Sequence, residues 1–152
     1  MRPARRSAKL SLSTLLVSFA LVASTLLAPP GASATTTREA RLLSRINTAR
    51  AHRGLAAVRP DPALSAYAHR HAAAMARRGW LVHTRSFSAV CCWRAIGENI
   101  AYDRTVRRAH RALMRSPAHR ANILNPAYRQ VGVGIVRANG RLWITQVFRR
   151  PS

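Results

Sequence analysis

The feature that most constrains the fold of this sequence is a two-residue turn, Asn139-Gly140, between two stretches of alternating apolar residues. An Asn-Gly pair readily adopts the positive φ angles of a hairpin turn that matches the twist of two antiparallel strands. Apolar residues alternate from 131 to 135 before the turn, and residues 142–148 form the returning strand. The sequence therefore predicts that the chain ends in an antiparallel hairpin.

Apolar residues at helical spacing precede this hairpin. Thr36 and Glu39 have the spacing of a capping box and predict the start of a first helix, which loses its pattern near Gly54. Asp61-Pro62 combines a side-chain cap with a first-turn proline and predicts a second helix that ends at Gly79.

The remaining segments complete the predicted element order. Residues 80–94 lack a period and predict a surface loop, whereas residues 96–102 predict a short strand. Asp103 or Thr105 is expected to cap a third helix, and Ser116-Pro117 predicts a short fourth one. With helices first, a hairpin last and no βαβ alternation, phosphate loop or repeat, the fold class is predicted to be α+β.

The first 34 residues are typical of a secretory signal peptide. A basic start is followed by an apolar run from Leu10 to Leu27 and by the small-residue pattern Ala32-Ser33-Ala34. Serine and threonine dilute the run, which favours a cleaved leader over the alternative, a transmembrane anchor. We expect cleavage after Ala34, a secreted, extracellular protein with a single domain over 35–152, and no transmembrane segment after cleavage.

The charge of the chain is strongly positive. The formal net charge is +22, and removal of the four basic residues of the leader brings it from +22 to +18. Such a surface attracts polyanions without a specific site, and outside a cell these include anionic wall polymers and lipid head groups. The arginines accompany no basic-region, zinc-finger or aromatic RNA-binding pattern, so no specific nucleic acid is predicted as a partner.

The two cysteines, Cys91 and Cys92, are adjacent, and an ordinary internal disulfide is not expected because the small ring strains the intervening peptide. In an oxidising compartment the options are a strained vicinal bridge, an intermolecular bridge, or buried thiols. Burial of at least one thiol is the favoured expectation. The oligomeric state stays open, because either cysteine could link two chains.

Carboxylates are scarce, since the chain has only four. Glu39, Asp61 and Asp103 lie at predicted helix starts, where the helix dipole stabilises a negative charge. Glu98 lies instead in the segment Gly97-Glu98-Asn99-Ile100-Ala101, at the start of a predicted strand. Glu98 is therefore the acid left for a functional role.

Five short motifs, taken in order, resemble those of the CAP superfamily, also called SCP or the cysteine-rich secretory, antigen 5 and pathogenesis-related proteins. The motifs are His83-Thr84, Gly97–Ala101, Ser116–Leu124, Val131–Gly134 and Thr145–Phe148. The bacterial secreted branch is the most similar, and the resemblance extends from about Arg41 to Phe148. It implies a CAP-type α-β-α sandwich with a small antiparallel sheet between helices.

The resemblance also implies a site. Family members gather two histidines and two glutamates in a central cleft, and some bind a divalent metal there. The matching motifs place the cleft residues at His83, Glu98 and His119. The same motifs supply three residues that support the cleft, Asn99, Asn122 and Gln146.

The sequence departs from the family pattern at the second glutamate, since residues 104–116 contain no carboxylate. Leu113 stands where many relatives have tryptophan, and Ala118 replaces a common glycine. These departures put carboxylate-dependent hydrolysis in doubt. His83, Glu98 and His119 still form a workable ligand set for Zn²⁺ or another divalent metal with an open fourth position, although a hydrogen-bonded structural cluster is the favoured expectation.

The other histidines and the tryptophans are given no catalytic role. His71 is expected to border an apolar stripe and three further histidines to face solvent. The tryptophans are expected to lie in the core or the cleft wall, in preference to the alternative, a platform for carbohydrate. The residues in question are His52, His69 and His110, and Trp80, Trp93 and Trp143.

The predicted function is noncatalytic extracellular binding of a lipid, glycan or protein through the cleft and the basic surface. One alternative is a divalent-metal-dependent hydrolase acting on peptide or cell-wall material. Another is a cationic protein that adheres to polyanions or membranes, for which high salt should abolish partner binding.

Overall fold

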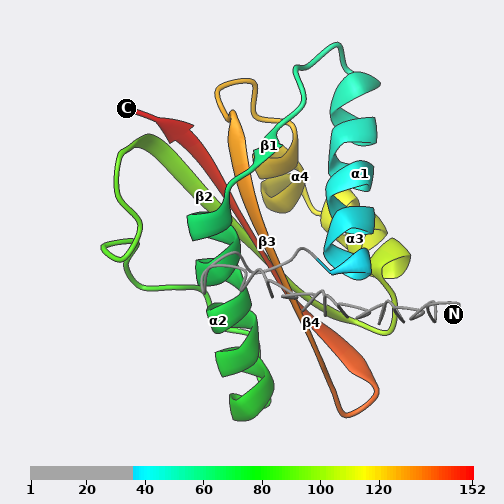
Figure 1. Cartoon of the computed structure of the whole chain (residues 1–152). Coiled ribbons are helices and arrows are strands. Elements are labelled where there is room, and N and C mark those ends of the chain that lie inside the picture. The colour runs from blue at the N-terminus through cyan, green and yellow to red at the C-terminus, as the bar shows by residue number, and fades with distance from the viewer. Residues whose placement is uncertain (1–35) are drawn as a thin grey trace, which may run out of the picture. The chain divides into compact units, whose positions relative to one another are not determined.

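The computed structural model describes residues 36–152 (Figure 1). The predicted signal peptide, residues 1–34, lies outside the described residues. From residue 36 onward, no helix has the length and apolar character needed to cross a membrane. The elements in chain order are α1 (Thr37–Ala51), β1 (Arg59–Pro60), α2 (Pro62–Arg78), β2 (Trp93–Asp103), α3 (Val106–Arg115), α4 (Pro117–Ile123), β3 (Gln130–Ala138) and β4 (Arg141–Pro151).

The four strands form one sheet in the order β1-β3-β4-β2. β3 and β4 form the predicted hairpin, with positive φ angles of 50° at Asn139 and 72° at Gly140. β2 pairs antiparallel with β4 and forms one edge of the sheet. The expected sheet was purely antiparallel, but β1 pairs parallel with β3. Two residues are too few to show a strand period, so the sequence could not reveal β1.

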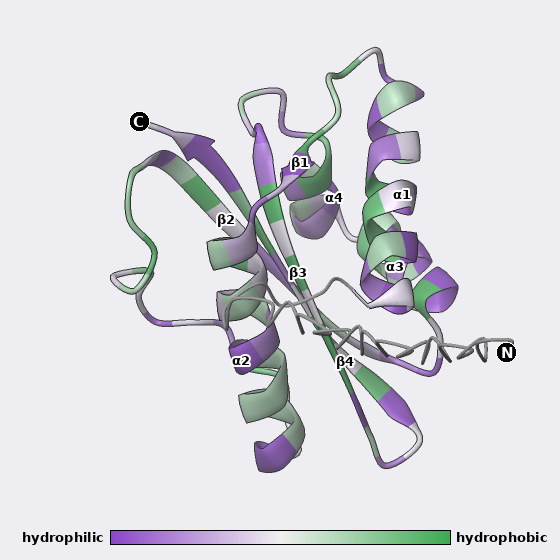
Figure 2. Cartoon of the chain, in the orientation of Figure 1, coloured by the Kyte–Doolittle hydropathy of each residue, from purple (hydrophilic) through white to green (hydrophobic). Residues whose placement is uncertain are grey.

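The helices cover both faces of the sheet, which confirms the predicted three-layer sandwich. α2 packs on one face, and α1, α3 and α4 pack on the other (Figure 1). Gly132 and Gly134 of β3 allow the close approach of α2, because a Cβ atom at either position would overlap the backbone of Leu64 or Ala68. Figure 2 shows hydrophobic and hydrophilic residues interleaved along α1, as expected for a helix with one buried face.

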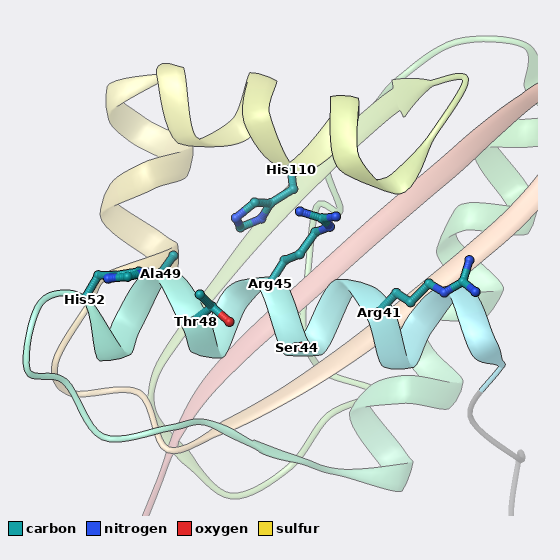
Figure 3. A pocket seen from close by; sticks show the side chains of 7 residues that line it. All are labelled: Arg41, Ser44, Arg45, Thr48, Ala49, His52 and His110. Atoms are coloured by element: carbon teal, nitrogen blue, oxygen red, sulfur yellow. The ribbon is translucent and has the colours of Figure 1, made fainter.

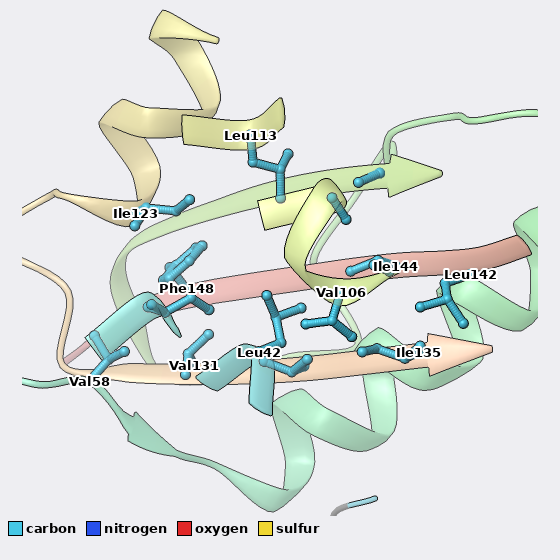
Figure 4. Close-up of a cluster of buried hydrophobic side chains, with 14 of the residues drawn as sticks. Leu42, Val58, Val106, Leu113, Ile123, Val131, Ile135, Leu142, Ile144 and Phe148 are labelled. Carbon is cyan, nitrogen blue, oxygen red and sulfur yellow. The ribbon is translucent and has the colours of Figure 1, made fainter. Parts of the chain in front are cut away.

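The larger hydrophobic core lies between the sheet and the layer of α1, α3 and α4 (Figure 4). Leu42 and Ile46 of α1 and Phe148 of β4 are fully buried there. A smaller cluster on the opposite face joins Leu64 of α2 to Val147 of β4. Alternate residues of β4 therefore anchor different helix layers.

Helix capping confirms most of the predicted boundaries. The Thr36 hydroxyl accepts from the Glu39 amide, and the Glu39 carboxylate accepts from the Thr36 amide. Asp61 caps α2 by accepting from the Leu64 amide. Thr105 caps α3. The expectation that Asp103 opens this helix is wrong, because Asp103 ends β2.

The cysteines correct another expectation. Cys91 and Cys92 form a vicinal disulfide, and both residues are exposed, so the favoured expectation of a buried thiol is wrong. The pair lies in the surface segment just before β2. Cys92 has a φ of 64°, and the C-terminal strand holds the pair through donation from Arg149 to the Cys91 carbonyl and from the Ser152 amide to the Cys92 carbonyl.

A buried arginine connects α1 to the segment that follows α4. Arg50 is 0% exposed. Its guanidinium donates to the carbonyls of Ala56, Ile123, Asn125 and Tyr128, at 2.8 to 3.3 Å. Burial, followed by repulsion from Arg129, lowers the pKa of Arg50. The planar fork satisfies carbonyls that no helix or strand would otherwise pair.

We predict that Arg50→Met lowers the free energy of unfolding by about 3 kcal/mol or more, because it removes four hydrogen bonds and leaves the carbonyls of Ala56 and Ile123 without a donor. Urea denaturation of this variant beside Arg53→Met, an exposed neighbour in the next turn, measures the difference. The Arg53 variant is expected to stay within about 0.5 kcal/mol of the parent. A loss below about 1 kcal/mol for Arg50→Met would show that water or a local shift replaces the guanidinium.

Candidate functional site

The carboxylate of Glu98 is the centre of the site. Its side chain is only 4% exposed and extends from β2 toward the face that α2 covers. Oε2 accepts a hydrogen bond from Nδ1 of His83 at 2.7 Å and another from the backbone amide of Thr84 at 3.0 Å. Because a carboxylate can only accept, Nδ1 of His83 carries the proton in this pair. Glu98 therefore fixes the loop after α2 against the edge strand.

His71 joins this group, which the sequence did not indicate. It lies on α2, and its Nε2 is 3.5 Å from Oε1 of Glu98 and 2.8 Å from the carbonyl of Val82. Nε2–H of His71 donates its hydrogen bond to the Val82 carbonyl, and Oε1 of Glu98 is buried without a hydrogen bond from any described residue. The one available signal in the sequence was that His71 borders the apolar stripe of this helix.

His119 approaches from the opposite side of β2. It lies on α4, and its ring stacks with that of His83, with centroids 6.4 Å apart and planes 25° apart. Burial, followed by repulsion from His83, lowers the pKa of His119. The structure therefore brings His83 into contact with both Glu98 and His119, while no hydrogen bond joins the imidazole of His119 to Glu98.

A network of buried amides positions His119. Asn99 and Gln146 are cross-strand partners on β2 and β4 and are both fully buried. Asn99 donates to Gln146 Oε1 and to the His119 carbonyl, and Asn122 of α4 donates to Asn99 Oδ1 and to the Glu98 carbonyl. The three support residues expected from the sequence thus form one network, which attaches α4 to the sheet.

These residues do not fit a metal as they are arranged. Among residues 36–152, no three His, Cys, Asp or Glu side chains form a group that could hold a metal ion. One oxygen of Glu98 is bonded to His83 and Thr84, and the other is buried. The arrangement therefore supports no metal-dependent reaction, and the ligand set of His83, Glu98 and His119 stays a prediction.

No second carboxylate completes the site within the described part of the chain. Each of the other three acids has partners elsewhere. Glu39 binds the amides of Thr36 and Ile135, Asp61 pairs with Arg149, and Asp103 pairs with Arg108.

An open cavity of about 540 Å³, which we call the histidine cleft, is lined by His83, whereas the other two predicted cleft residues, Glu98 and His119, do not line it. Trp80 is 61% exposed at this cleft, Trp143 is buried in the core and Trp93 is partly exposed. Trp93 thus meets neither expectation for the tryptophans, since it lies outside the core and lines no part of the cleft.

The residues that line the histidine cleft are His71, Arg78, Trp80, Val82, His83, Thr84 and Arg85. Its charged groups are cationic, which favours an anionic group beside an aromatic ring.

The lowered pKa of His119 predicts a pH-dependent stability. Below the ordinary value of 6.5, the unfolded chain binds a proton that the folded protein does not, so the free energy of unfolding falls as the pH drops. His119→Asn removes this contribution and keeps the backbone carbonyl that binds Asn99. Urea denaturation from roughly pH 8 to pH 5 is expected to show a smaller decline for His119→Asn than for the parent or for His69→Asn, an exposed control. Parallel curves would contradict the assignment.

Comparison with known proteins identifies the family of the chain and supports its fold. Residues 43–148 match the family described as CAP, the cysteine-rich secretory protein family. No curated protein sequence matches the chain significantly.

Several solved structures share the fold at low sequence identity. An outer surface protein of Borrelia burgdorferi has a TM-score of 0.70 at 17% identity, with 78% of this chain and 96% of that chain covered. An extracellular SCP-domain protein of Bacillus anthracis has a TM-score of 0.65 at 22% identity, with 73% and 39% covered. Venom allergen-like protein 4 of Schistosoma mansoni has a TM-score of 0.65 at 10% identity, with 77% and 90% covered. The family match extends over more than half of the sequence, and the chain belongs to the cysteine-rich secretory protein (CAP) family.

Proposed function

We propose that this protein is secreted and binds an anionic glycan in the histidine cleft without catalysing a reaction. The observation that carries the proposal is the exposed side chain of Trp80 in a cleft that is also lined by the cationic side chains of Arg78 and Arg85. An aromatic face can stack on a sugar ring, and an arginine fork binds a carboxylate with two hydrogen bonds. The predicted signal peptide and the two similar proteins described as outer surface and extracellular support an extracellular location.

The lining of the cleft favours a glycan over a lipid or a protein. Apart from Trp80, the only large apolar side chain that lines it is Val82. An acyl chain needs apolar walls to leave water. A volume of about 540 Å³ falls in the range of small-molecule sites, which favours a saccharide over a folded protein.

The arrangement of acids argues against hydrolysis. Glycoside hydrolysis commonly uses two carboxyl groups on opposite sides of the scissile bond. Glu98 is the single carboxylate near this cleft among residues 36–152, and its buried oxygens are turned toward His83, Thr84 and His71. The geometry supports a role for Glu98 in holding the cleft wall.

We predict that Trp80→Ala weakens binding of a carboxylated amino-sugar oligosaccharide, N-acetylglucosaminyl–N-acetylmuramic acid, by about tenfold or more, equivalent to ~1.4 kcal/mol. Trp93→Ala is the matched control, because Trp93 is also exposed but does not line the cleft. Calorimetric titration of the parent and both variants measures the dissociation constants. Equal losses in the two variants, or no binding to the parent, would reject a glycan site in the cleft.

The same samples test the absence of catalysis. The parent, incubated with the oligosaccharide in the presence and absence of Zn²⁺, is expected to leave it intact when the products are analysed by mass spectrometry. Cleavage that needs Zn²⁺ and disappears in a folded His83→Ala and His119→Ala double variant would instead establish the metal-dependent hydrolase.

A further inference from the structure

A second set of cationic side chains lies away from the histidine cleft, on the surface formed by α1 and α3. A groove of about 490 Å³ runs between these helices, with Arg41, Arg45, His52 and His110 in its lining (Figure 3). A second hollow of about 280 Å³ is lined by the same two arginines of α1 together with four more. We call this surface the arginine groove and define it by Arg38, Arg41, Arg45, Arg104, Arg107 and Arg137.

The charge of the arginine groove is not balanced by acids of the described chain. None of its six guanidinium groups makes a hydrogen bond or an ion pair within residues 36–152. The two nearest acids in the sequence are already used, because Glu39 is buried and bonded to the Ile135 amide and Asp103 is paired with Arg108. Like charges at this density repel one another, so an anion that binds here relieves the repulsion as well as forming contacts.

His110 gives the groove a neutral polar wall. Burial, followed by repulsion from Arg45, lowers the pKa of His110, so its imidazole stays uncharged beside the arginines. Its Nδ1 is buried and has no hydrogen-bond partner among the described residues. The expectation that His110 faces solvent is therefore wrong, because its ring points from α3 toward α1, next to Arg45 (Figure 3).

We propose that the arginine groove binds successive phosphate groups of a flexible polyanion that carries no bases. Guanidinium forks bind phosphate oxygens in pairs, and two hollows that share Arg41 and Arg45 offer positions for consecutive phosphates. No aromatic side chain lines either hollow, apart from the imidazoles of His52 and His110, so the stacking platforms of single-stranded nucleic-acid sites are missing there.

A membrane surface is a weaker match for the arginine groove. The exposed large apolar side chains of the described chain lie outside it, so none is available to enter a bilayer at this position. Those residues are Trp80, Leu81, Trp93 and Tyr102. The proposal is independent of the glycan proposal, because the two surfaces share no lining residue.

The test is binding of inorganic polyphosphate to the purified protein, measured by calorimetry across a salt series. Arg41→Gln with Arg45→Gln is expected to weaken binding by about tenfold or more. The matched control, Arg70→Gln with Arg77→Gln, removes the same charge from exposed positions on α2 and is expected to cost less than about threefold. For a flexible chain, each lost phosphate contact lowers the magnitude of the slope of log K against log salt by about 0.7. The groove variant, which loses two such contacts, should therefore lower it by roughly 1.4.

Two further experiments test whether the groove recognises phosphate groups through the guanidinium fork and whether it prefers a chain without bases. Arg41→Lys with Arg45→Lys is expected to bind more weakly than the parent, because lysine keeps the charge but loses the fork. Equal losses in the glutamine pair and its α2 control would overturn the proposal in favour of attraction by net charge alone. Single-stranded DNA of equal charge that binds as tightly as polyphosphate would overturn the preference for a chain without bases. Thermal unfolding confirms that each variant is folded, as expected for exposed side chains without hydrogen bonds.

Discussion

The buried carboxylate of Glu98 is the interaction on which the site depends. A charge that is 4% exposed is stable only when donors surround it, and here the donors come from the loop after α2. On the other face of the same strand, Asn99 and Asn122 hold α4, which carries His119. One edge strand, β2, therefore contacts α2 through His71, the loop after α2, and α4. The histidine cleft lies along α2 and that loop.

The distribution of acids explains why the exterior is so basic. All four acids of the chain already have partners: they cap helices, bind backbone amides or pair with a specific arginine or histidine, and Asp103 pairs with the exposed Arg108. No further carboxylate remains to neutralise the other surface arginines, which include those of the arginine groove and those beside Trp80. The two surfaces differ in one respect, since only the histidine cleft pairs its arginines with an exposed indole.

The sequence predicted features that depend on neighbouring residues, and it missed contacts between segments far apart in the chain. The hairpin at Asn139-Gly140 and the start of α2 at Asp61 depend on neighbouring residues, and both are confirmed. The parallel pairing of β1, the clamp of Arg50 and the place of His71 near Glu98 join segments remote in sequence, which periodicity does not detect. Glu98 was singled out by elimination among the four acids, whereas His83 was found only through family motifs. Spacing alone could not have shown that His83 contacts Glu98.

The most direct test of this account is the protonation of His83 at Nδ1, which nitrogen-detected NMR of the imidazole resonances can assign. If Glu98 holds the cleft through this bond, Nδ1 of His83 carries a proton in both the neutral and the charged ring, and a folded Glu98→Gln variant changes that resonance. A neutral His83 with its proton on Nε2 and a bare Nδ1 would contradict the account, because the carboxylate would then not hold the loop.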